Sequence, residues 1–250
     1  MTDKTKKGLK RLKKIIFPDK CPICGTVRPQ WFSELSGEEG TGALCPGCRG
    51  RIKHVKEPLC KKCGRSLTSD EREYCSDCEK YEHNFAEGRS IYEYDGDMKS
   101  LVYRFKYSNR RDFAELFVAE MGRDCRNWLE SKEIDMVVPI PLHPDKQRKR
   151  GYNQSEVFGA ALAGDMGLAF EKDLLLRNRY TSPQKGLSRP ERINNLKNAF
   201  ILKQSGVKSS KMNILLVDDI YTTGATVDAA AAVLRDVANV YFLCICNGRR

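Results

Sequence analysis

Residues 213–228 place two adjacent carboxylates directly before a turn of small and hydroxyl-bearing residues. The stretch reads NILLVDDIYTTGATVD, so Asp218 and Asp219 follow an apolar run and precede the turn at Gly224. Two carboxylates can accept hydrogen bonds from the vicinal hydroxyls of a ribose, and they can also hold a hydrated Mg²⁺. Backbone N–H groups of a small-residue turn can approach a phosphate, and the helix that follows adds its dipole. This stretch therefore predicts a site for a phosphorylated ribose.

The candidate contacts of this stretch lie at the carboxyl end of a predicted strand, where ligands of open α/β sheets bind. Gly224 allows the turn, and the threonines add hydroxyl donors. A generic phosphate loop or a chance turn is the alternative interpretation. The candidate ligand contacts are Asp218, Asp219, Tyr221, Thr222, Thr223, Gly224, Ala225 and Thr226, and the first two are also the candidate catalytic residues.

A second candidate site follows residues 138–142, VPIPL, where basic residues come directly after an apolar run. A cluster of cations could neutralise the charge of a diphosphate there, whereas the plainer interpretation is an exposed basic loop. His143 could act as a general acid or base, or it could be only a polar neighbour. The candidate contacts are Pro141, Leu142, His143, Arg148 and Arg150.

Residues 179–200 form a polar segment between two predicted strands. The segment could be a mobile loop that closes over a diphosphate, in which case Arg189 and Arg192 are the candidate anion contacts. A solvated helix with surface charges is the alternative.

Eight of the eleven cysteines form four Cys-x-x-Cys pairs. Two such pairs supply the four thiolates of a tetrahedral zinc site, so four pairs predict two sites. The odd count and the lack of an export signal favour thiolate ligation over a disulfide framework. The spacing favours sequential pairing, with a cross-braced pairing and an iron–sulfur cluster as alternatives. The predicted ligands are Cys21, Cys24, Cys45 and Cys48 in one site, and Cys60, Cys63, Cys75 and Cys78 in the other.

The role expected of both zinc ions is structural, because four cysteine ligands leave no open position for a catalytic water. Zinc would add folding energy on the order of 10–16 kcal/mol per site to a segment too short for its own core. Lysines and arginines lie between the pairs. Contact with nucleic acid is therefore an alternative to a purely architectural role.

Beyond the last cysteine pair, short apolar runs alternate with amphipathic stretches, which predicts an α/β fold with a parallel sheet covered by helices on both faces. The run at residues 134–140 and the one at 213–217 have the apolar character of buried parallel strands. The predicted strands span residues 89–94, 134–140, 174–177, 199–202, 213–217 and 240–246, and the predicted helices span residues 97–106, 113–128, 154–164 and 226–236.

The pattern divides the chain into a basic amphipathic helix over residues 1–18, a cysteine module over 19–82 and a sheet domain over 88–250. The net charge is +11, which favours a polyanionic partner such as nucleic acid or a phosphate compound over a merely basic surface. No run of 18 apolar residues and no signal-peptide core is present. We therefore expect no stable membrane insertion, and a reducing cytoplasm as the location.

The order strand–Asp–Asp–x–x–Thr–Thr–Gly–x–Thr resembles the diphosphoribose signature of type I phosphoribosyltransferases. The chain as a whole resembles the ComF family, also called ComFC, in the tandem cysteine pairs, in VVPIPLHPDKQRKRGYNQSE at residues 137–156 and in VDDIYTTGAT at residues 217–226. A third part of the resemblance is a pattern of separated residues: Thr181, Gln184, Leu187, Arg189, Arg192, Asn195 and Phe200.

The resemblance implies a type I phosphoribosyltransferase-like domain preceded by a small double zinc ribbon. It implies that phosphoribosyl diphosphate binds with Mg²⁺ at Asp218 and Asp219, and that a loop at Pro141, Leu142 and His143 grips the pyrophosphate. It further implies a role in natural transformation, in which the protein handles incoming single-stranded DNA beside a helicase-like ATPase.

Two other functions stay open on the sequence. One is an active phosphoribosyltransferase of nucleotide metabolism with an unknown acceptor. The other is a transcription regulator of the purine-repressor type, although no helix-turn-helix pattern is evident. No segment for recognising an acceptor base is evident either, unless the cysteine module takes that place.

Overall fold

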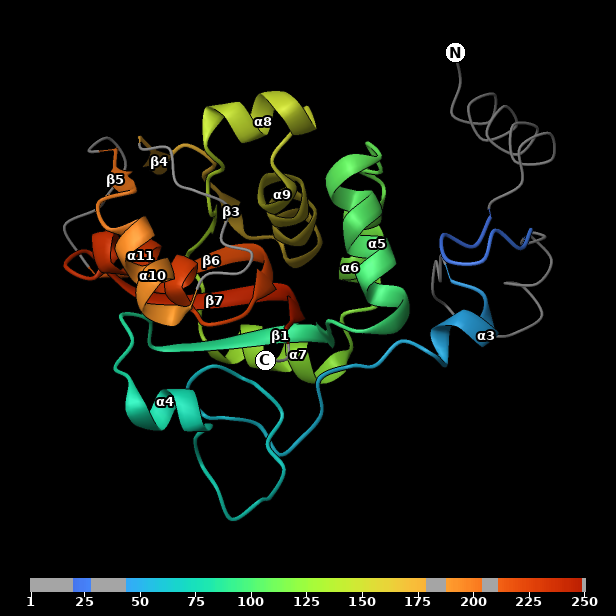
Figure 1. Ribbon diagram of the computed structural model, residues 1–250, viewed down its shortest axis with the longest axis horizontal. Helices are drawn as coiled ribbons and strands as arrows, with labels where there is room; N and C mark the ends of the chain where they lie inside the picture. The colour runs from blue at the N-terminus through green and yellow to red at the C-terminus, as the bar shows by residue number, and fades with distance from the viewer. Residues whose placement is uncertain (1–19, 28–43, 179–187, 204–210, 249–250) are drawn as a thin grey trace. The chain divides into compact units, whose positions relative to one another are not determined.

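The computed structural model describes residues 20–27, 44–178, 188–203 and 211–248 (Figure 1). The chain divides into two compact units, Met1–Ile52 and Lys53–Arg250. The first cysteine group belongs to the first unit, and the second group belongs to the same unit as the sheet. The helix predicted over residues 1–18 lies outside the described residues.

The described part of the first unit is a pair of cysteine turns. Gly25, whose φ is 75°, closes the first turn, and its N–H donates to the Cys21 carbonyl at 2.8 Å. The second turn is α3 (Pro46–Arg49), which begins with a proline at its first position, where the missing N–H costs no hydrogen bond.

The second unit is built on five parallel strands in the order β1-β7-β6-β2-β3. The two long central strands consist largely of buried apolar residues, as a sheet covered on both faces requires. The strands are β1 (Glu87–Glu93), β2 (Met136–Pro139), β3 (Ala169–Phe170), β6 (Met212–Tyr221) and β7 (Ala238–Asn247).

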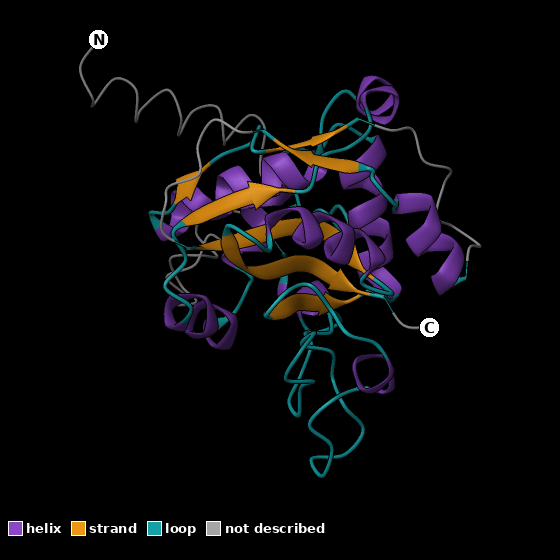
Figure 2. Ribbon diagram, turned by 90° about the vertical axis from the view of Figure 1, so that its left-hand side faces the viewer, coloured by secondary structure: helices purple, strands orange, loops and turns teal. Residues whose placement is uncertain are grey.

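Helices cover both faces of this sheet (Figures 1 and 2). On one face lies α9 (Gln154–Met166), where a Cβ at Gly159 would meet Val217 at 2.8 Å, so glycine lets the helix approach closely. On the other face lies α11 (Ala225–Leu234), whose Ala230 shares a buried cluster with Leu216. Side chains of adjacent strand residues point to opposite faces of the sheet, so Val217 lies on the face of α9 and Leu216 on the face of α11. The predicted fold class is confirmed.

Three further helices pack around the sheet: α5 (Gly96–Tyr107), α6 (Phe113–Ala119) and α7 (Arg123–Ser131). The prediction of one helix over residues 113–128 was wrong. Gly122 has a φ of 82°, a conformation that breaks the helix and starts α7 in a new direction. The short helix α4 (Ser76–Lys80) belongs to the second cysteine group.

Residues 141–143 form a loop after β2, as the resemblance implies, but the basic residues that follow lie on a helix, α8 (Pro144–Arg150), and not on the exposed loop that was the alternative interpretation. The polar segment after residue 187 likewise contains a helix, α10 (Arg189–Leu196), with Ser188 and Glu191 forming a capping box. Residues 179–187 of that segment lie outside the described residues. The strands β4 (Leu175–Arg177) and β5 (Phe200–Leu202) pair antiparallel in a separate two-stranded sheet.

Within the residues that the structure describes, we find no helix that combines the length and the apolar character needed to cross a membrane.

Candidate ligand pocket and metal centres

A crevice is expected where β2 and β6 lie side by side, because the chain leaves these two strands in opposite directions. After β2 it passes through α9 to β3, and after β6 it passes through α11 to β7 on the other side. Such a point of reversal, outside the carboxyl ends of parallel strands, is where open α/β sheets bind ligands.

A pocket of about 550 Å³ occupies this place. Five basic side chains and two carboxylates line it, so its walls suit a ligand with several negative charges. The lining residues are Lys106, Tyr107, Ile140, Pro141, Leu142, Lys146, Lys149, Arg150, Arg177, Asp218, Asp219, Ile220, Thr222 and Thr226.

The carboxylate of Asp218 is held from behind by α9, since the Ser155 hydroxyl donates to Asp218 Oδ1 at 2.9 Å. The Asp219 N–H donates to the same oxygen at 2.8 Å. Burial, and next the neighbouring Asp219 carboxylate, raise the pKa of Asp218 to about 7. Asp218 can therefore take up or release a proton near neutral pH.

The second carboxylate already has a counterion inside the protein. Lys106 Nζ of α5 lies 2.9 Å from Asp219 Oδ2, and both side chains are largely buried. Burial alone would lower the pKa of Lys106, but the Asp219 carboxylate outweighs burial and raises it. The pair anchors the end of β6 to α5.

The turn after β6 is shaped by Gly224, whose φ is 79°. A Cβ at this position would lie 2.7 Å from the Tyr221 hydroxyl, so glycine is required both for the turn and for the space. Tyr221 itself is buried and stacks on Phe242 with ring centroids 4.7 Å apart. It supports the turn from the core and does not line the pocket.

Two arginines from other parts of the chain hold the same turn. Arg192 of α10 donates to the Thr222 hydroxyl at 2.8 Å. Arg65, from the second cysteine group, donates to the Thr222 carbonyl at 2.8 Å. Thr222 and Thr226 line the pocket, whereas Thr223, Gly224 and Ala225 do not.

The predicted contacts after β2 separate into two groups. Pro141, Leu142 and Arg150 line the pocket. His143 instead caps α8, because its Nδ1 accepts from the Asp145 N–H at 3.2 Å. Arg148 forms an ion pair with Asp145 on the exposed side of α8, and neither it nor His143 lines the pocket. Arg189 begins α10, but its side chain lies outside the described residues.

The sequence reasoning missed several residues of this site, among them Lys106, Ser155 and Arg177. A sequence signal for Ser155 was present: the polar run Asn153, Gln154 and Ser155 precedes an apolar helical stretch. In the structure all three of these residues are buried. Asn153 donates to the Ile140 carbonyl at 3.1 Å, which ties this helix to the end of β2.

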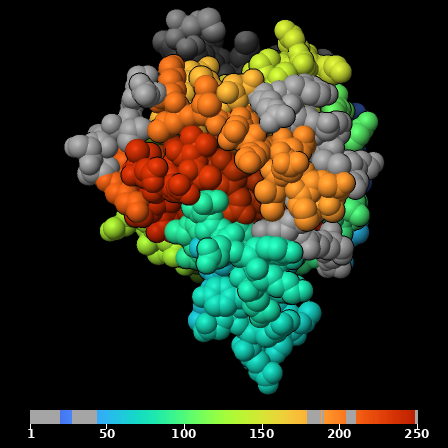
Figure 3. All heavy atoms as spheres, turned by 60° about the vertical axis from the view of Figure 1, so that its left-hand side comes forward, coloured from blue at the N-terminus to red at the C-terminus, as the bar shows by residue number. Residues whose placement is uncertain are grey.

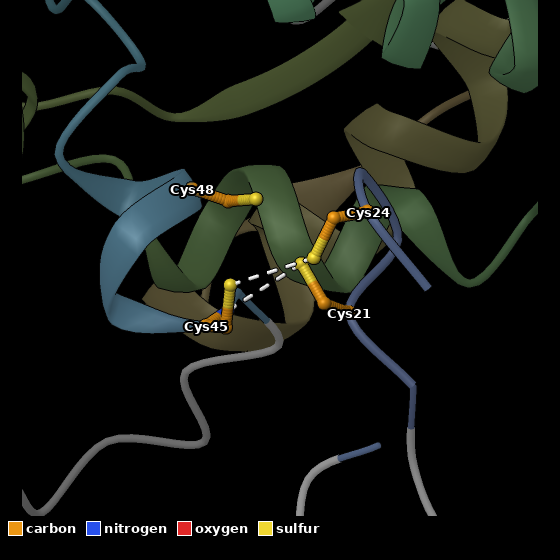
Figure 4. A group of neighbouring side chains, drawn as sticks. All are labelled: Cys21, Cys24, Cys45 and Cys48. Carbon is orange, nitrogen blue, oxygen red and sulfur yellow. Dashed lines mark hydrogen bonds between the residues drawn. The ribbon is translucent and has the colours of Figure 1, made fainter. Parts of the chain in front are cut away.

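Each cysteine group has the geometry of a tetrahedral metal site. Within each group the sulfurs all lie within 4.8 Å of one another. Figure 4 shows the first group, in which the side chains of Cys21, Cys24, Cys45 and Cys48 converge. The Sγ atoms of Cys24 and Cys45 are 3.6 Å apart, and those of Cys63 and Cys75 are 3.7 Å apart. Zinc–sulfur bonds of about 2.3 Å in a tetrahedron place the sulfurs roughly 3.8 Å apart, so both groups fit zinc.

The two groups are built alike. In each, the first cysteine of the second pair donates its N–H to the first sulfur of the first pair, Cys45 to Cys21 at 3.5 Å and Cys75 to Cys60 at 3.3 Å. This confirms the sequential pairing, with Cys21, Cys24, Cys45 and Cys48 in one group and Cys60, Cys63, Cys75 and Cys78 in the other. Four cysteines fill a tetrahedral site, which fits structural zinc.

The second cysteine group is tied to the pocket wall by a chain of polar contacts. His83 Nε2 lies 3.5 Å from Cys78 Sγ, and His83 Nδ1 lies 2.6 Å from Asp228 Oδ2 on α11. The Asn84 N–H donates to the other oxygen of the same carboxylate at 3.0 Å. Figure 3 shows the segment that carries the second cysteine group, in teal, against the red surface of the C-terminal elements. Together with Arg65, these contacts place the second group directly behind the turn that lines the pocket.

Asp218→Asn is expected to stabilise the protein increasingly as pH rises. The pKa of Asp218 is raised from 3.8 to about 7, so its stabilising contribution is present in acid and is lost as pH rises to about 7. Asparagine stays neutral and avoids that loss. Denaturant titrations should show the free energy of unfolding of the variant rising relative to wild type by about 1–2 kcal/mol between about pH 5.5 and about pH 7.5. This value is smaller than the full pKa shift implies, because the pocket admits solvent. An advantage that does not change with pH would contradict the shifted pKa.

Comparison with known proteins gives matches over both parts of the chain. The double zinc ribbon domain family matches residues 12–79. Competence protein F of Haemophilus influenzae is 32% identical over 196 residues, which cover 77% of this chain and 84% of that protein. Competence protein ComFC of Streptococcus pneumoniae is 31% identical over 222 residues, which cover 87% and 94%. The DNA utilization protein YhgH of Salmonella typhimurium is 28% identical over 222 residues, which cover 87% and 96%.

Solved structures similar to the chain include adenine phosphoribosyltransferase from Saccharomyces cerevisiae, with a TM-score of 0.33, 20% identity, and coverage of 52% of this chain and 68% of that one. The competence proteins, which match over most of their length, confirm the family resemblance noted in the sequence. The similarity to the solved structure is too weak to add to this conclusion. With competence protein F matched across most of its length, the chain belongs to the ComF/ComFC family of competence proteins.

Proposed function

We propose that this protein binds phosphoribosyl diphosphate, with Mg²⁺, in the pocket between β2 and β6, and that it handles single-stranded DNA during competence. The observation that carries the first part is that Asp218 and Asp219 line one pocket together with five basic side chains at the carboxyl ends of two parallel strands. The family membership supports the second part, since the relatives are competence and DNA utilization proteins.

The pocket offers a separate place for each part of such a ligand. Asp218 and Asp219 can accept hydrogen bonds from the ribose hydroxyls. The turn at Thr222 and Thr226, at the N-terminus of α11, suits the 5-phosphate. Four basic side chains of the lining suit the diphosphate: Lys146, Lys149, Arg150 and Arg177.

A magnesium ion suits the same donor set, because Mg²⁺ prefers carboxylate, phosphate and water oxygens. Asp218 and Asp219 would hold it together with the ligand's own oxygens. Bound there, the ion would neutralise diphosphate charge. Lys106 is already the counterion of the Asp219 carboxylate, so the magnesium ion would share this carboxylate with Lys106.

The DNA part of the proposal rests on charge. The chain carries a net charge of +11, and basic side chains concentrate around the pocket. A helicase-like ATPase is the partner that the family resemblance implies for this step. Binding of an oligonucleotide that weakens steeply as salt is raised would support DNA handling, and an affinity indifferent to salt would contradict it.

A phosphoribosyltransferase activity with an unidentified acceptor is the second candidate function. It is favoured by Asp218, whose pKa of about 7 lets it exchange a proton near neutral pH. An acceptor nitrogen would bond to the anomeric carbon, the bond to the diphosphate oxygen would break, and the acceptor's proton would pass to a base. Release of pyrophosphate with a panel of acceptors tests this activity, and ligand binding with no release would contradict it.

Ligand recognition is tested by thermal unfolding with phosphoribosyl diphosphate and MgCl₂. A ligand at about one hundred times its Kd should stabilise the protein by about 2.7 kcal/mol. Ribose 5-phosphate, which lacks the diphosphate, should stabilise it much less. Equal stabilisation by the two ligands would show that the basic wall does not recognise a diphosphate.

A further inference from the structure

Two tyrosines stand on the outer face of α5 with their rings together. Tyr103 is 62% exposed and Tyr107 is 55% exposed, the two highest values among the large hydrophobic side chains of the described residues. Their ring centroids are 4.9 Å apart, with the ring planes tilted by 49°. An exposed aromatic pair of this kind commonly marks a surface used for binding.

The pair contributes little to the core of the protein. The apolar residues of α5 that pack inward are Met98, Leu101, Val102 and Phe105. Tyr103 and Tyr107 are one helical turn apart from each other on the opposite side, so any polar residue could replace them without opening the core. Their exposure therefore needs a reason outside folding.

The surroundings of the pair are basic. Arg150 of α8 donates to the Tyr107 hydroxyl at 3.2 Å, and its guanidinium carbon lies 5.1 Å from the centre of the Tyr107 ring. Apart from Lys106, which is buried against Asp219, residues 96–112 contain four basic and two acidic side chains, and α8 contains four basic and one acidic. One of the acidic residues, Asp112, is already paired with Arg110. The surface around the rings thus complements a chain of phosphates.

Aromatic rings beside cations are what unpaired nucleic acid recognises. Each base of a single strand presents a flat face that stacks on a tyrosine ring, while its phosphates contact lysine and arginine. In a duplex the same faces are hidden by stacking within the helix. A protein partner would favour an interface core depleted of charge, unlike this one.

We propose that Tyr103 and Tyr107 form a stacking platform for the unpaired bases of single-stranded DNA, with Lys149 and Arg150 holding its phosphates. This inference rests on the proposed function and identifies the surface responsible for it. Tyr107 also lines the ligand pocket, so the strand passes the mouth of that pocket. Lys149 and Arg150 line the pocket as well, so single-stranded DNA and phosphoribosyl diphosphate would share these two cations and the Tyr107 ring.

Fluorescence anisotropy with a labelled oligothymidylate of about 20 nucleotides tests the platform. Tyr103→Ala should weaken binding roughly tenfold, as loss of one stacked base does. Tyr103→Phe keeps the ring and should restore most of the affinity. The slope of affinity against salt should stay unchanged in both variants, because neither substitution removes a charge.

The matched control is Tyr74→Ala, since Tyr74 is an exposed tyrosine of the second cysteine group. A similar loss at Tyr74 and Tyr103, or no loss at Tyr103, would overturn the platform. Tyr103 does not line the pocket, so stabilisation of Tyr103→Ala by phosphoribosyl diphosphate reports that the variant is folded.

The two proposals fail separately. If the wild-type protein binds no single-stranded DNA, the proposed function itself fails. If it binds DNA and Tyr103→Ala binds equally well, only the assignment of the surface fails. Duplex of the same length should bind with no difference between wild type and Tyr103→Ala, and a tenfold difference there would contradict stacking as the cause.

Discussion

Replacing Cys60 with serine is expected to weaken the binding of phosphoribosyl diphosphate at least about tenfold, although Cys60 does not line the pocket. The Cys60 N–H donates to the Arg65 carbonyl at 2.8 Å, so the cysteine turn holds Arg65 in place. Arg65 in turn donates to the Thr222 carbonyl in the wall of the pocket. A hydrogen bond from a charged donor contributes about 1.5–3 kcal/mol, which is the source of the expected factor.

The size of the effect follows from the dependence of the cysteine segment on its metal. Zinc in a four-cysteine site contributes on the order of 10–16 kcal/mol to folding of its segment. Loss of one ligand therefore releases the segment, and with it both Arg65 and the pair of His83 with Asp228. The turn that faces the ligand then loses its support from both contacts.

Cys21→Ser is the matched control, because Cys21 belongs to the other compact unit and every residue of the pocket belongs to Lys53–Arg250. Calorimetric titration should give near wild-type affinity for Cys21→Ser and a reduced affinity for Cys60→Ser. Arg65→Ala, which leaves all eight cysteines in place, should reproduce part of the loss. Equal affinities for the two cysteine variants would show that the second group does not support the pocket.

The second large effect is expected from Lys106→Met, which should lower the free energy of unfolding by about 3–5 kcal/mol. Lys106 is largely buried, and its removal leaves the Asp219 carboxylate without a counterion beside the Asp218 carboxyl. Methionine retains most of the packing volume. The loss therefore reports the unpaired charge rather than a cavity, and denaturant unfolding without ligand measures it.

Two further variants isolate the cause. Lys106→Met combined with Asp219→Asn removes both charges, and it should recover most of the lost stability because no buried charge is left unpaired. Lys53→Met removes one partner of an exposed pair, 3.0 Å from Asp95, and should cost less than about 1 kcal/mol. A double variant as unstable as Lys106→Met would exclude the ion pair as the explanation.

The parts of the site that the sequence could predict are those that are local in the chain. The strand β6, the turn at Gly224 and the start of α11 follow one another without interruption, so their residue types alone predict a phosphate site. The cysteine pairs are also local, and their spacing predicts both metal groups. The pairing between them became certain only in three dimensions.

The residues that were missed come from distant elements. Lys106 lies in an amphipathic helix, where a lysine is expected on the surface, and only the packing of α5 against β6 buries it. Arg65 lies in the cysteine segment and reaches Thr222 across most of the chain. Such contacts depend on how the elements pack, which a single sequence does not reveal.

Two charged helices, α8 and α10, show how charge can obscure a helix in the sequence. The sequence of α8 is PDKQRKR, with no apolar residue to mark a buried face, and it is stabilised by its ends instead. Proline stands at its first position and His143 caps it, while Arg148, Lys149 and Arg150 occupy its last turn, where they favour the helix dipole. The capping box at Ser188 was a similar signal for α10.

The central claim is that the pocket at the carboxyl ends of β2 and β6 binds phosphoribosyl diphosphate through its two carboxylates. Calorimetric titration of the zinc-loaded protein with phosphoribosyl diphosphate and MgCl₂ tests it most directly, using wild type and the double variant Asp218→Ala/Asp219→Ala. We expect saturable binding by the wild type and a loss of at least about a hundredfold in the variant, as removal of two ligand-facing groups implies. No binding by the wild type, or equal binding by the variant, would contradict it.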